Sequence, residues 1–277
     1  MRPRMTVLGS GSSGNATLLQ YDDANLLIDA GLGPRQIQNR IRDIGCGWAD
    51  LDGVLLTHTH GDHWRENTLA KLARFEIPFY CHPRHATDLR NRSDAFRQIE
   101  ESGLVRKYRA GERNRLPFDG QMTPFEVSHD SGPTLGFRIE REGSLFSPGW
   151  AVAYAADLGT WTEDLLPYLV DADLLALEFN HDVPMQRVSR RPPFLIERVL
   201  GDKGHLSNGQ ACELLSAVIR ASASGRLKKL VQLHLSRECN TPRLAQREAK
   251  SKLTELNQRV EVATAAPHQP TAITGWA

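Results

Sequence analysis

Three histidines and one aspartate occur within six residues of this chain, in the segment Thr57-His58-Thr59-His60-Gly61-Asp62-His63. The apolar run before it, residues 53–56, is typical of a buried strand, so these side chains stand where a strand ends and a loop begins. Alternate residues of an extended chain point the same way, which lets His58 and His60 hold one metal ion together. The next glycine lets the backbone turn and delivers Asp62 and His63 to a second position.

Three later strand-like runs also end in a potential metal ligand, and these ligands are His129, Asp157 and His234. Each of them alone is more often a structural residue. Together they complete two metal sites, because the carboxylate of Asp157 can place one oxygen on each ion. Imidazole and carboxylate ligands suit zinc, manganese or iron better than calcium or magnesium alone, and nothing in the ligand set chooses zinc over manganese. The alternative, a polar loop with histidines by chance, fits so dense a cluster poorly.

The elements that must position these residues follow from apolar periodicity and turn signals. We expect strands at 4–8, 16–20, 25–29, 53–57, 79–81, 123–129, 136–141, 150–156, 174–179, 230–235 and 260–263. We expect helices at 34–44, 66–75, 84–100, 162–169, about 186–200 after a break at Arg191-Pro-Pro193, 207–221 and 243–257. Strands that first pair with each other and then alternate with helices favour two sheets sandwiched between helix layers. We find no repeat and no linker, so we predict one domain over residues 1–277.

Bulk composition excludes several classes of protein. The formal net charge of +1 argues against a protein that binds nucleic acid through charge alone, although residues 84–115 and 187–198 are locally basic. Such charge runs are often only solvated faces. The four cysteines are scattered, which fits reduced thiols better than a disulfide framework. With no signal-like or membrane-spanning run, we expect a soluble protein of the cytoplasm without a membrane partner.

A loop rich in glycine and serine, residues 9–15, follows the first strand. Its backbone can approach a phosphate closely, but it lacks the lysine of a P-loop and leads into a strand instead of a helix. Ser207 and Gln210 have the spacing of a capping box at the start of a strong helix. The candidate substrate contacts are Ser12, Ser13, Asn15 and Ser207.

Residues 57–63 resemble the signature of the metallo-β-lactamase superfamily, and His129, Asp157 and His234 match its later ligand motifs in order. Within that superfamily the chain is similar to the YycJ/WalJ branch over nearly all of residues 5–265. The motifs that carry this resemblance are Leu8-Gly-Ser-Gly-Ser-Ser-Gly-Asn15, Val127-Ser-His-Asp130, Glu178-Phe-Asn-His-Asp182, Gly204-His-Leu-Ser-Asn208 and His234-Leu-Ser-Arg-Glu238.

This resemblance implies an αββα sandwich, with two mixed β-sheets flanked by helices, and two divalent metal ions. Metal one would be held by His58, His60 and His129. Metal two would be held by Asp62, His63 and His234, with Asp157 bridging and Asp62 also acting in catalysis. By similarity to ribonuclease Z enzymes, His205 assists phosphodiester cleavage and Glu178 orients it. The resemblance gives no role to Asn180, His181 and Asp182.

The implied activity is a 5′→3′ exodeoxyribonuclease that uses a metal-bridging hydroxide, with DNA as the nucleic-acid substrate. The alternatives are a phosphodiesterase for small or cyclic phosphates, an RNA-processing nuclease, and a hydrolase of thioesters or lactams, which would not need the pair Glu178 and His205. A non-catalytic module on the same fold would be free to lose ligands, and this chain keeps all seven. Residues 142–150 depart from the branch as a longer hairpin that could form a lip over the site. Oligomeric state does not follow from the sequence.

Overall fold

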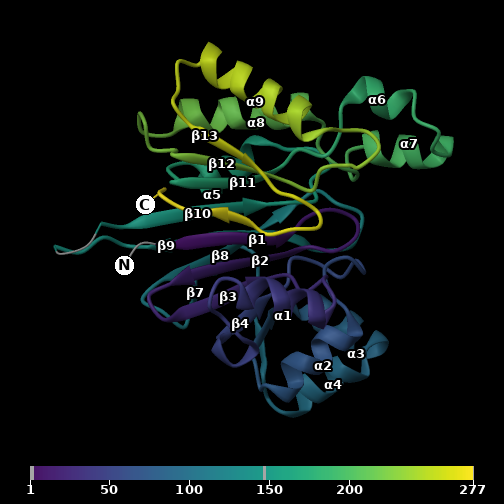
Figure 1. Ribbon diagram of the computed structural model, residues 1–277, viewed down its shortest axis with the longest axis vertical. Helices are drawn as coiled ribbons and strands as arrows, with labels where there is room; N and C mark the ends of the chain where they lie inside the picture. The colour runs from purple at the N-terminus through teal and green to yellow at the C-terminus, as the bar shows by residue number, and fades with distance from the viewer. Residues whose placement is uncertain (1–2, 146–147, 277) are drawn as a thin grey trace. The chain divides into compact units, whose positions relative to one another are not determined.

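The computed structural model describes residues 3–145 and 148–276, which divide into two compact units (Figure 1). The first unit comprises the described residues up to Asp119 together with Ala266–Gly275, and the second comprises Gly120–Ala265 with Trp276. Each unit has a hydrophobic core of its own. One domain over residues 1–277 stays a prediction.

The first unit is built on a mixed sheet whose strands, among the described residues, lie in the order β14-β1-β2-β3-β4-β5-β6. Successive strands from β14 through β1 and β2 to β3 pair antiparallel, and β3 to β6 run parallel. The strands are β1 (Arg4–Gly9), β2 (Ala16–Tyr21), β3 (Ala24–Ile28), β4 (Gly53–Leu55), β5 (Phe79–Cys81), β6 (Val105–Lys107) and β14 (Thr271–Ile273). The helical segments are α1 (Pro34–Arg42), η1 (Trp48–Asp50), α2 (Glu66–Arg74), α3 (Pro83–Arg92) and α4 (Asp94–Glu101).

The parallel strands β3 and β4 are short apolar runs. Their residues Leu27, Ile28, Val54 and Leu55 are completely buried, as is usual for parallel strands that are covered on both faces. Ile28 is paired with Leu55, so the residues that follow each strand leave the sheet at the same edge. This register brings the end of β3 beside the loop that carries the first four candidate ligands.

The second unit contains a mixed sheet with the order β13-β12-β11-β10-β9-β8. The strands β13 to β10 run parallel, while β10, β9 and β8 are antiparallel. The strands are β8 (Gln121–Val127), β9 (Thr134–Arg141), β10 (Trp150–Ala155), β11 (Leu174–Glu178), β12 (Lys229–Leu233) and β13 (Glu261–Thr264). The helical segments are η2 (Glu163–Leu165), α5 (Leu166–Leu169), α6 (Val183–Arg187), α7 (Pro193–Leu200), α8 (Asn208–Ala221) and α9 (Pro242–Glu255).

Helix α8 begins as the sequence predicts. The Ser207 hydroxyl accepts from the backbone N–H of Gln210, and the Gln210 side chain accepts from the backbone N–H of Ser207. This reciprocal capping box satisfies two donors that the first turn would otherwise leave unpaired. It fixes where the helix starts, immediately after the segment that carries His205.

The predicted helix over residues 84–100 is wrong, because the segment forms two helices that meet at Ser93. Ser93 has extended backbone angles (φ −140°, ψ 120°), ends α3 and caps α4 by accepting from the backbone N–H of Phe96 at 2.9 Å. A serine followed by aspartate is a helix-start signal, and here it outweighs the continuous helical periodicity.

The predicted helix over about 186–200 is also only partly right, since the structure has a short α6 and a separate α7 that starts at the proline break. Three short strands were not predicted, namely β6, β14 and β7 (Asn114–Arg115), which lies just before the second unit begins. With two or three residues each, they are too short to show a period. The predicted lip at residues 142–150 includes residues 146–147, which lie outside the described part of the chain.

The four cysteines are free and buried, which confirms the prediction of unpaired thiols. Over the residues that the structure describes, no helix combines the length and apolar character needed to cross a membrane.

Candidate metal centre

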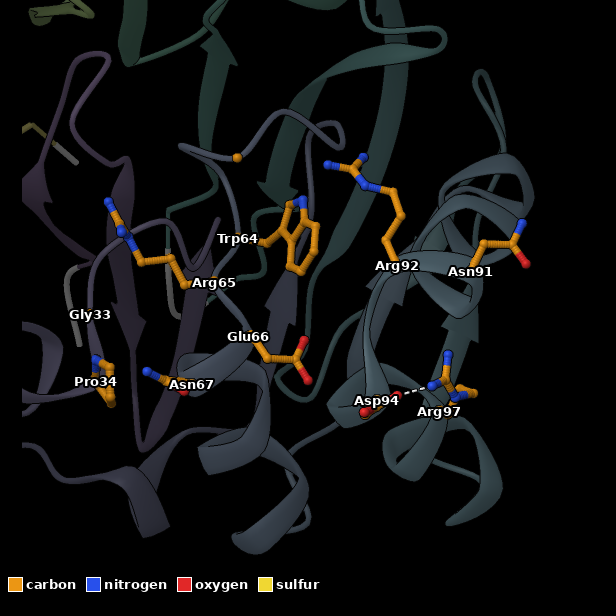
Figure 2. A pocket seen from close by; sticks show the side chains of 11 residues that line it. Gly33, Pro34, Trp64, Arg65, Glu66, Asn67, Asn91, Arg92, Asp94 and Arg97 are labelled. Carbon is orange, nitrogen blue, oxygen red and sulfur yellow. Dashed lines mark ion pairs between the residues drawn. The ribbon is translucent and has the colours of Figure 1, made fainter.

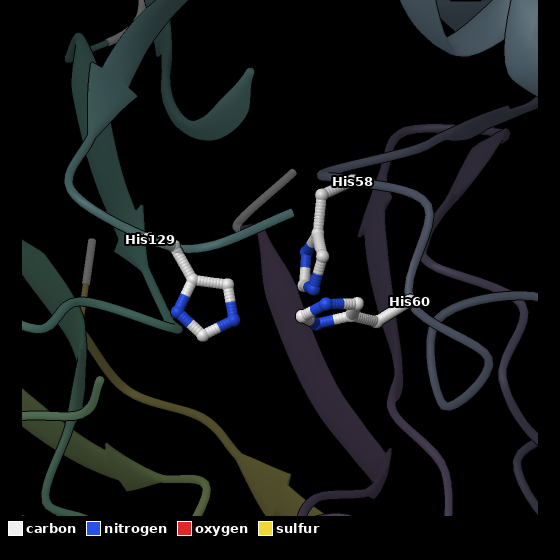
Figure 3. Close-up of side chains that lie close together, drawn as sticks. All are labelled: His58, His60 and His129. Atoms are coloured by element: carbon white, nitrogen blue, oxygen red, sulfur yellow. The ribbon is translucent and has the colours of Figure 1, made fainter. Parts of the chain in front are cut away.

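The histidines of the metal loop, residues 57–63, follow β4 directly. His58 is completely buried and His60 is half-buried. Their ring centroids lie 4.9 Å apart, and Figure 3 shows the two imidazoles next to each other at the end of the loop. The expectation that alternate residues of this segment present their rings to one place is therefore met.

His63 is held in one tautomer by a buried carboxylate that the sequence did not single out. Nδ1 of His63 lies 2.8 Å from Oδ2 of Asp29, and the Thr57 backbone N–H and hydroxyl both donate to the same carboxylate. An Nδ1–H that donates to Asp29 leaves Nε2 with its lone pair, which is the form that binds a metal. Complete burial raises the pKa of Asp29, although the charge and hydrogen bond of His63 and the hydrogen bonds from Thr57 oppose the rise.

Asp62 is positioned through its backbone. Its carbonyl accepts from the backbone N–H of Asn15 at 2.8 Å, and the backbone N–H of Gly31 donates to the Asn15 carbonyl at 2.9 Å. A Cβ at Gly31 would lie 1.7 Å from the Asp62 carbonyl oxygen, so only glycine permits this approach. The side-chain amide of Asn15 also lies 3.3 Å from Oδ2 of Asp62 and 3.0 Å from Nε2 of His63.

Gly61 of the metal loop helps to line a hollow of about 720 Å³ (Figure 2). Trp64 Nε1 and Arg92 Nη1 both donate to the carbonyl of Thr59, at 3.0 and 3.2 Å, and the Arg92 guanidinium lies 5.2 Å from the centroid of the Trp64 ring. Arg65 donates to the carbonyls of Gly31 and Ser13. These side chains tie the metal loop to α3 and to the glycine-serine loop.

In the second unit, three of the predicted site residues lie at the carboxyl ends of the parallel neighbours β10, β11 and β12. Asp157 and His234 follow their strands, and Glu178 is the last residue of its strand. Asp157 and His234 have left-handed backbone angles, with φ of 58° and 54°. Such angles cost energy in most residues and gather at functional sites, where they turn a side chain out of the direction of its strand. Ligand atoms of Asp157, Glu178, His205 and His234 all lie within 4.8 Å of one another.

The carboxylate of Glu178 is the centre of this second group. Oε1 lies 2.8 Å from Nδ1 of His205 and 3.0 Å from Nδ1 of His234, while Oε2 accepts from the backbone N–H groups of Leu158 and Leu206. Burial opposes ionisation of Glu178, but the charge and hydrogen bond of His205, with the hydrogen bond of His234, hold its pKa below the ordinary value. Glu178 is thus an anion that accepts from both imidazoles.

This geometry orients His205. Because Nδ1 faces Glu178, Nε2 is the ring nitrogen left for other partners, and the described part of the chain provides none. The side chain of His205 is about one-fifth exposed, whereas Glu178 is completely buried. His205 therefore directs Nδ1 at the buried carboxylate and leaves Nε2 on the other side of its ring.

His129 follows β8, in the same unit, and is buried. Its Nδ1 lies 3.0 Å from the carbonyl oxygen of Gly204. Donation to that carbonyl leaves the lone pair on Nε2, as for His63. The ring is drawn in Figure 3.

The structure gives roles to two of the three unassigned residues after Glu178. The amide of Asn180 donates to the backbone carbonyl of His234 at 2.8 Å, and Asp182 caps α6 by accepting from the backbone N–H of Met185. His181 is buried, and burial lowers its pKa to about 4. Neither nitrogen of the His181 ring has a partner within the described ranges.

The four predicted substrate contacts stay predictions, and they differ from one another in exposure and in hydrogen bonding. Ser12 is exposed and Ser13 is half-buried. The Asn15 amide is directed at Asp62 and His63, and the Ser207 hydroxyl is occupied in the capping box of α8. Asn15 therefore contacts two candidate ligands, and Ser207 fixes the start of α8.

The donor chemistry of both groups fits divalent metal ions. Each group combines imidazoles with a carboxylate. In His63 and His129 the Nδ1 atom faces an acceptor, which leaves the lone pair on Nε2, and in His63 the Asn15 amide lies 3.0 Å from that nitrogen. Nitrogen and oxygen donors of this kind bind zinc and manganese. The buried carboxylate of Asp157 lies within the second group, with Oδ1 3.2 Å from Nδ1 of His234.

Two mixed sheets with flanking helices, and imidazole and carboxylate groups at the ends of their strands, define a metal-dependent hydrolase of the metallo-β-lactamase fold. The family described as the beta-lactamase superfamily domain matches residues 24–224. The chain belongs to this family. The predicted fold class of two mixed sheets flanked by helices is confirmed.

The relatives cover nearly all of the chain. It is 29% identical over 266 residues to the exodeoxyribonuclease WalJ of Streptococcus pneumoniae serotype 2 (strain D39 / NCTC 7466), with 94% of this chain and 91% of the relative covered. It is 27% identical over 277 residues to the exodeoxyribonuclease YycJ of Bacillus anthracis, with 97% of each covered. The solved metallo-β-lactamase fold protein YhfI from Bacillus subtilis shares the fold, with a TM-score of 0.67 at 18% identity over 98% of this chain and 99% of that one. The predicted resemblance to the YycJ/WalJ branch is confirmed.

Proposed function

We propose that the chain is a 5′→3′ exodeoxyribonuclease of the cytoplasm that uses two divalent metal ions, zinc or manganese. Nuclease activity on DNA is supported by the relatives from Streptococcus pneumoniae and Bacillus anthracis, which are exodeoxyribonucleases. The hydrogen-bonded pair of Glu178 and His205 supports phosphodiester chemistry. Polarity and the choice of DNA over RNA rest on the resemblance to the YycJ/WalJ branch.

The ligands proposed for metal one are His58, His60 and His129. Those for metal two are Asp62, His63 and His234, and Asp157 would bridge the two ions. When bound, such ions lower the pKa of a water molecule and neutralise the charge of phosphate oxygens. These proposed ligands are oriented by the contacts described above. Asp29 faces Nδ1 of His63, the Gly204 carbonyl faces Nδ1 of His129, and the Asn15 backbone N–H donates to the Asp62 carbonyl.

His205 is proposed to deliver the proton that the leaving oxygen needs. Cleavage of a phosphodiester releases a sugar hydroxyl, which is a poor leaving group as an alkoxide, so a general acid at this oxygen accelerates the reaction. The observation that carries this role is the 2.8 Å contact between Glu178 Oε1 and His205 Nδ1, which leaves Nε2 to face the substrate. The anionic Glu178 keeps the imidazolium stable until its proton is transferred.

The test uses purified, manganese-loaded protein and DNA labelled at either end, with a 5′-phosphate or a 5′-hydroxyl. We expect mononucleotides to be released progressively from the 5′ end, with no release by Asp157→Ala, which controls for contaminating nucleases. Release from the 3′ end would reverse the polarity. With two metal ions bound and no cleavage of DNA, the nuclease proposal would fail, and small and cyclic phosphodiesters would be tested next.

A further inference from the structure

Helices α6 and α7 and their connections, residues 183–203, form a segment that we call the arm. In Figure 1 its helices stand out from the sheet of the second unit. The arm joins the motif that begins at Glu178 to the one that contains His205, so both of its ends lie beside catalytic residues.

The surface of the arm is both basic and apolar. It carries five basic against two acidic side chains. Arg187, Arg190 and Lys203 are exposed, and none of them has an ion-pair or hydrogen-bond partner among the residues described. Phe194 is 70% exposed and Val188 82% exposed, which makes them two of the few large hydrophobic side chains open to solvent. An exposed aromatic ring surrounded by unpaired cations is unusual for a surface that contacts only solvent, and it indicates a binding surface.

Three arginines of the first basic stretch, on helices α3 and α4, behave differently. Arg90 is paired with Glu100, Arg92 with Asp88 and Arg97 with Asp94. Much of the positive charge of α3 and α4 is therefore neutralised within the stretch itself. The charge of Arg187, Arg190 and Lys203 is not neutralised in this way and is available to an anionic partner.

The arm is fixed to the loops of the catalytic group. Arg198 Nε lies 2.5 Å from Oδ2 of Asp130, the neighbour of His129, and the backbone N–H of His205 donates to the Val199 carbonyl. Arg191 Nε lies 2.8 Å from Oε2 of Glu238, in the segment that follows His234. A ligand on the arm would thus be held in a defined position relative to His205.

We propose that the arm binds the single-stranded DNA chain whose phosphodiester is cleaved at His205; this inference rests on the proposed function. Arg187, Arg190 and Lys203 contact phosphates, and an unpaired base stacks on the ring of Phe194. Stacking on an exposed aromatic ring next to cations is how proteins bind single strands without reading their sequence. Because α7 is about 12 Å long at 1.5 Å per residue, Phe194 contacts a base a few nucleotides away from the scissile bond.

The experiment measures binding of a fluorescent single strand of about ten nucleotides in the presence of EDTA, and then its hydrolysis with manganese. The variants are Phe194→Ala, Phe194→Leu, Phe194→Trp and the double variant Arg187→Ser/Arg190→Ser. The matched control is Arg243→Ser/Lys250→Ser, which removes two exposed cations from α9. A dinucleotide and bis(p-nitrophenyl) phosphate serve as substrates too short to reach the arm.

We expect Phe194→Ala and Phe194→Leu to weaken binding roughly five- to one-hundred-fold, because only a ring can stack, and Phe194→Trp to retain it. The double arginine variant should reduce the slope of log Kd against log salt by about 1.4, which is 0.7 for each lost phosphate contact on a single strand. Hydrolysis of the two short substrates should stay unchanged, as should binding by the α9 control.

Several results would overturn the proposal. Equal losses in the arm and α9 variants would show only a general effect of charge. If Phe194→Leu bound DNA as tightly as the wild type, stacking on Phe194 would be excluded. If the Phe194 variants changed oligomeric state but kept their DNA affinity, the arm would be an interface between copies of the chain. The wild-type protein could also hydrolyse bis(p-nitrophenyl) phosphate but neither bind nor cut DNA. That result would reject DNA as the ligand of the arm and would leave the hydrolase chemistry intact.

Discussion

The carboxylate of Asp29 lies 2.8 Å from Nδ1 of His63, and both groups are completely buried. The contact joins the end of β3 to the metal loop after β4, which the parallel pairing of the two strands places side by side. Asp29 has a left-handed backbone, with φ of 61°, as do Asp157 and His234. At three strand ends in the two units, a left-handed backbone conformation thus turns the side chain of a predicted site residue or of its partner.

We predict that Asp29→Asn weakens metal binding roughly 10- to 100-fold, because the variant loses the charge that fixes the His63 tautomer and raises its basicity. Competition with a chromogenic chelator measures the affinity. Asp52→Asn is the matched control, since Asp52 accepts from the backbone N–H of Asn25 in the same unit and lies away from the ligands. An affinity equal to that of the wild type, in a folded variant, would show that Asp29 has only a structural role.

The second prediction separates proton delivery by His205 from metal binding. His205→Ala should lower kcat on DNA about 10²- to 10⁴-fold, the usual range for a general acid. On the p-nitrophenyl ester of thymidine 5′-monophosphate the loss should be under about tenfold, because p-nitrophenolate leaves without a proton.

Glu178→Gln provides the companion variant, since it removes the charge behind His205 but keeps an oxygen for the Leu158 and Leu206 backbone N–H groups. It should show the same dependence on the leaving group when both substrates are measured at saturating manganese. Metal affinity itself should fall, as for Asp29→Asn, because Glu178 also accepts from Nδ1 of the proposed ligand His234. Equal losses on both substrates would contradict the acid role.

Much of this site follows from the sequence because strand ends are visible there. The metal loop, His129, Asp157 and His234 each follow an apolar run, and periodicity locates such runs well. Asp29 also ends a predicted strand, 25–29, and so has the same pattern. A single carboxylate at a strand end is common in structural roles, so the pattern alone did not predict its contact with His63. The contacts of Asn15, Gly31 and Arg92 with the loop join residues 31 to 47 positions apart, and no local pattern encodes them.

The elements that prediction missed have local causes. The break at Ser93 depends on a cap that competes with continuous helical periodicity, and the sequence alone does not show which preference prevails. The strands β6, β7 and β14 have two or three residues each and form through their neighbours in a sheet. Their propensities carry too little information for a prediction.

The third prediction concerns the cysteines. Burial raises the pKa of Cys46 to about 11, and of Cys81 and Cys212 to about 12. Since the thiolate is the reactive form, these three buried thiols should react slowly with Ellman's reagent at pH 8 and rapidly in denaturant.

The same shifts have a consequence for stability. The unfolded chain loses these protons near the ordinary thiol pKa of 9.0, while the folded chain retains them. Stability should therefore decline as the pH rises above about 9. Two results would contradict the burial of these thiols. One is rapid labelling of the native wild-type protein, and the other is a wild-type stability that increases over this pH range.

The last prediction tests the close approach of Gly31 to the metal loop. A Cβ at Gly31 would lie 1.7 Å from the Asp62 carbonyl oxygen and 2.9 Å from the backbone nitrogen of Asn15. Neither backbone atom can move without breaking the bond between Asn15 and Asp62, so Gly31→Ala should destabilise the protein by about 1–3 kcal/mol or more. Because the displaced residue is a proposed ligand, metal affinity should fall together with the melting temperature.

Gly61→Ala is the control, since it lies in the same loop and its Cβ would meet nothing within 4 Å. It should change stability by no more than about 0.5 kcal/mol, as for most exposed substitutions. Thermal unfolding with and without manganese measures both effects, because bound metal raises the melting temperature of a protein that retains its site. If Gly31→Ala kept the wild-type stability and the wild-type shift with manganese, the loop would not depend on this contact, and the backbone of Asp62 would be positioned by Asn15 alone.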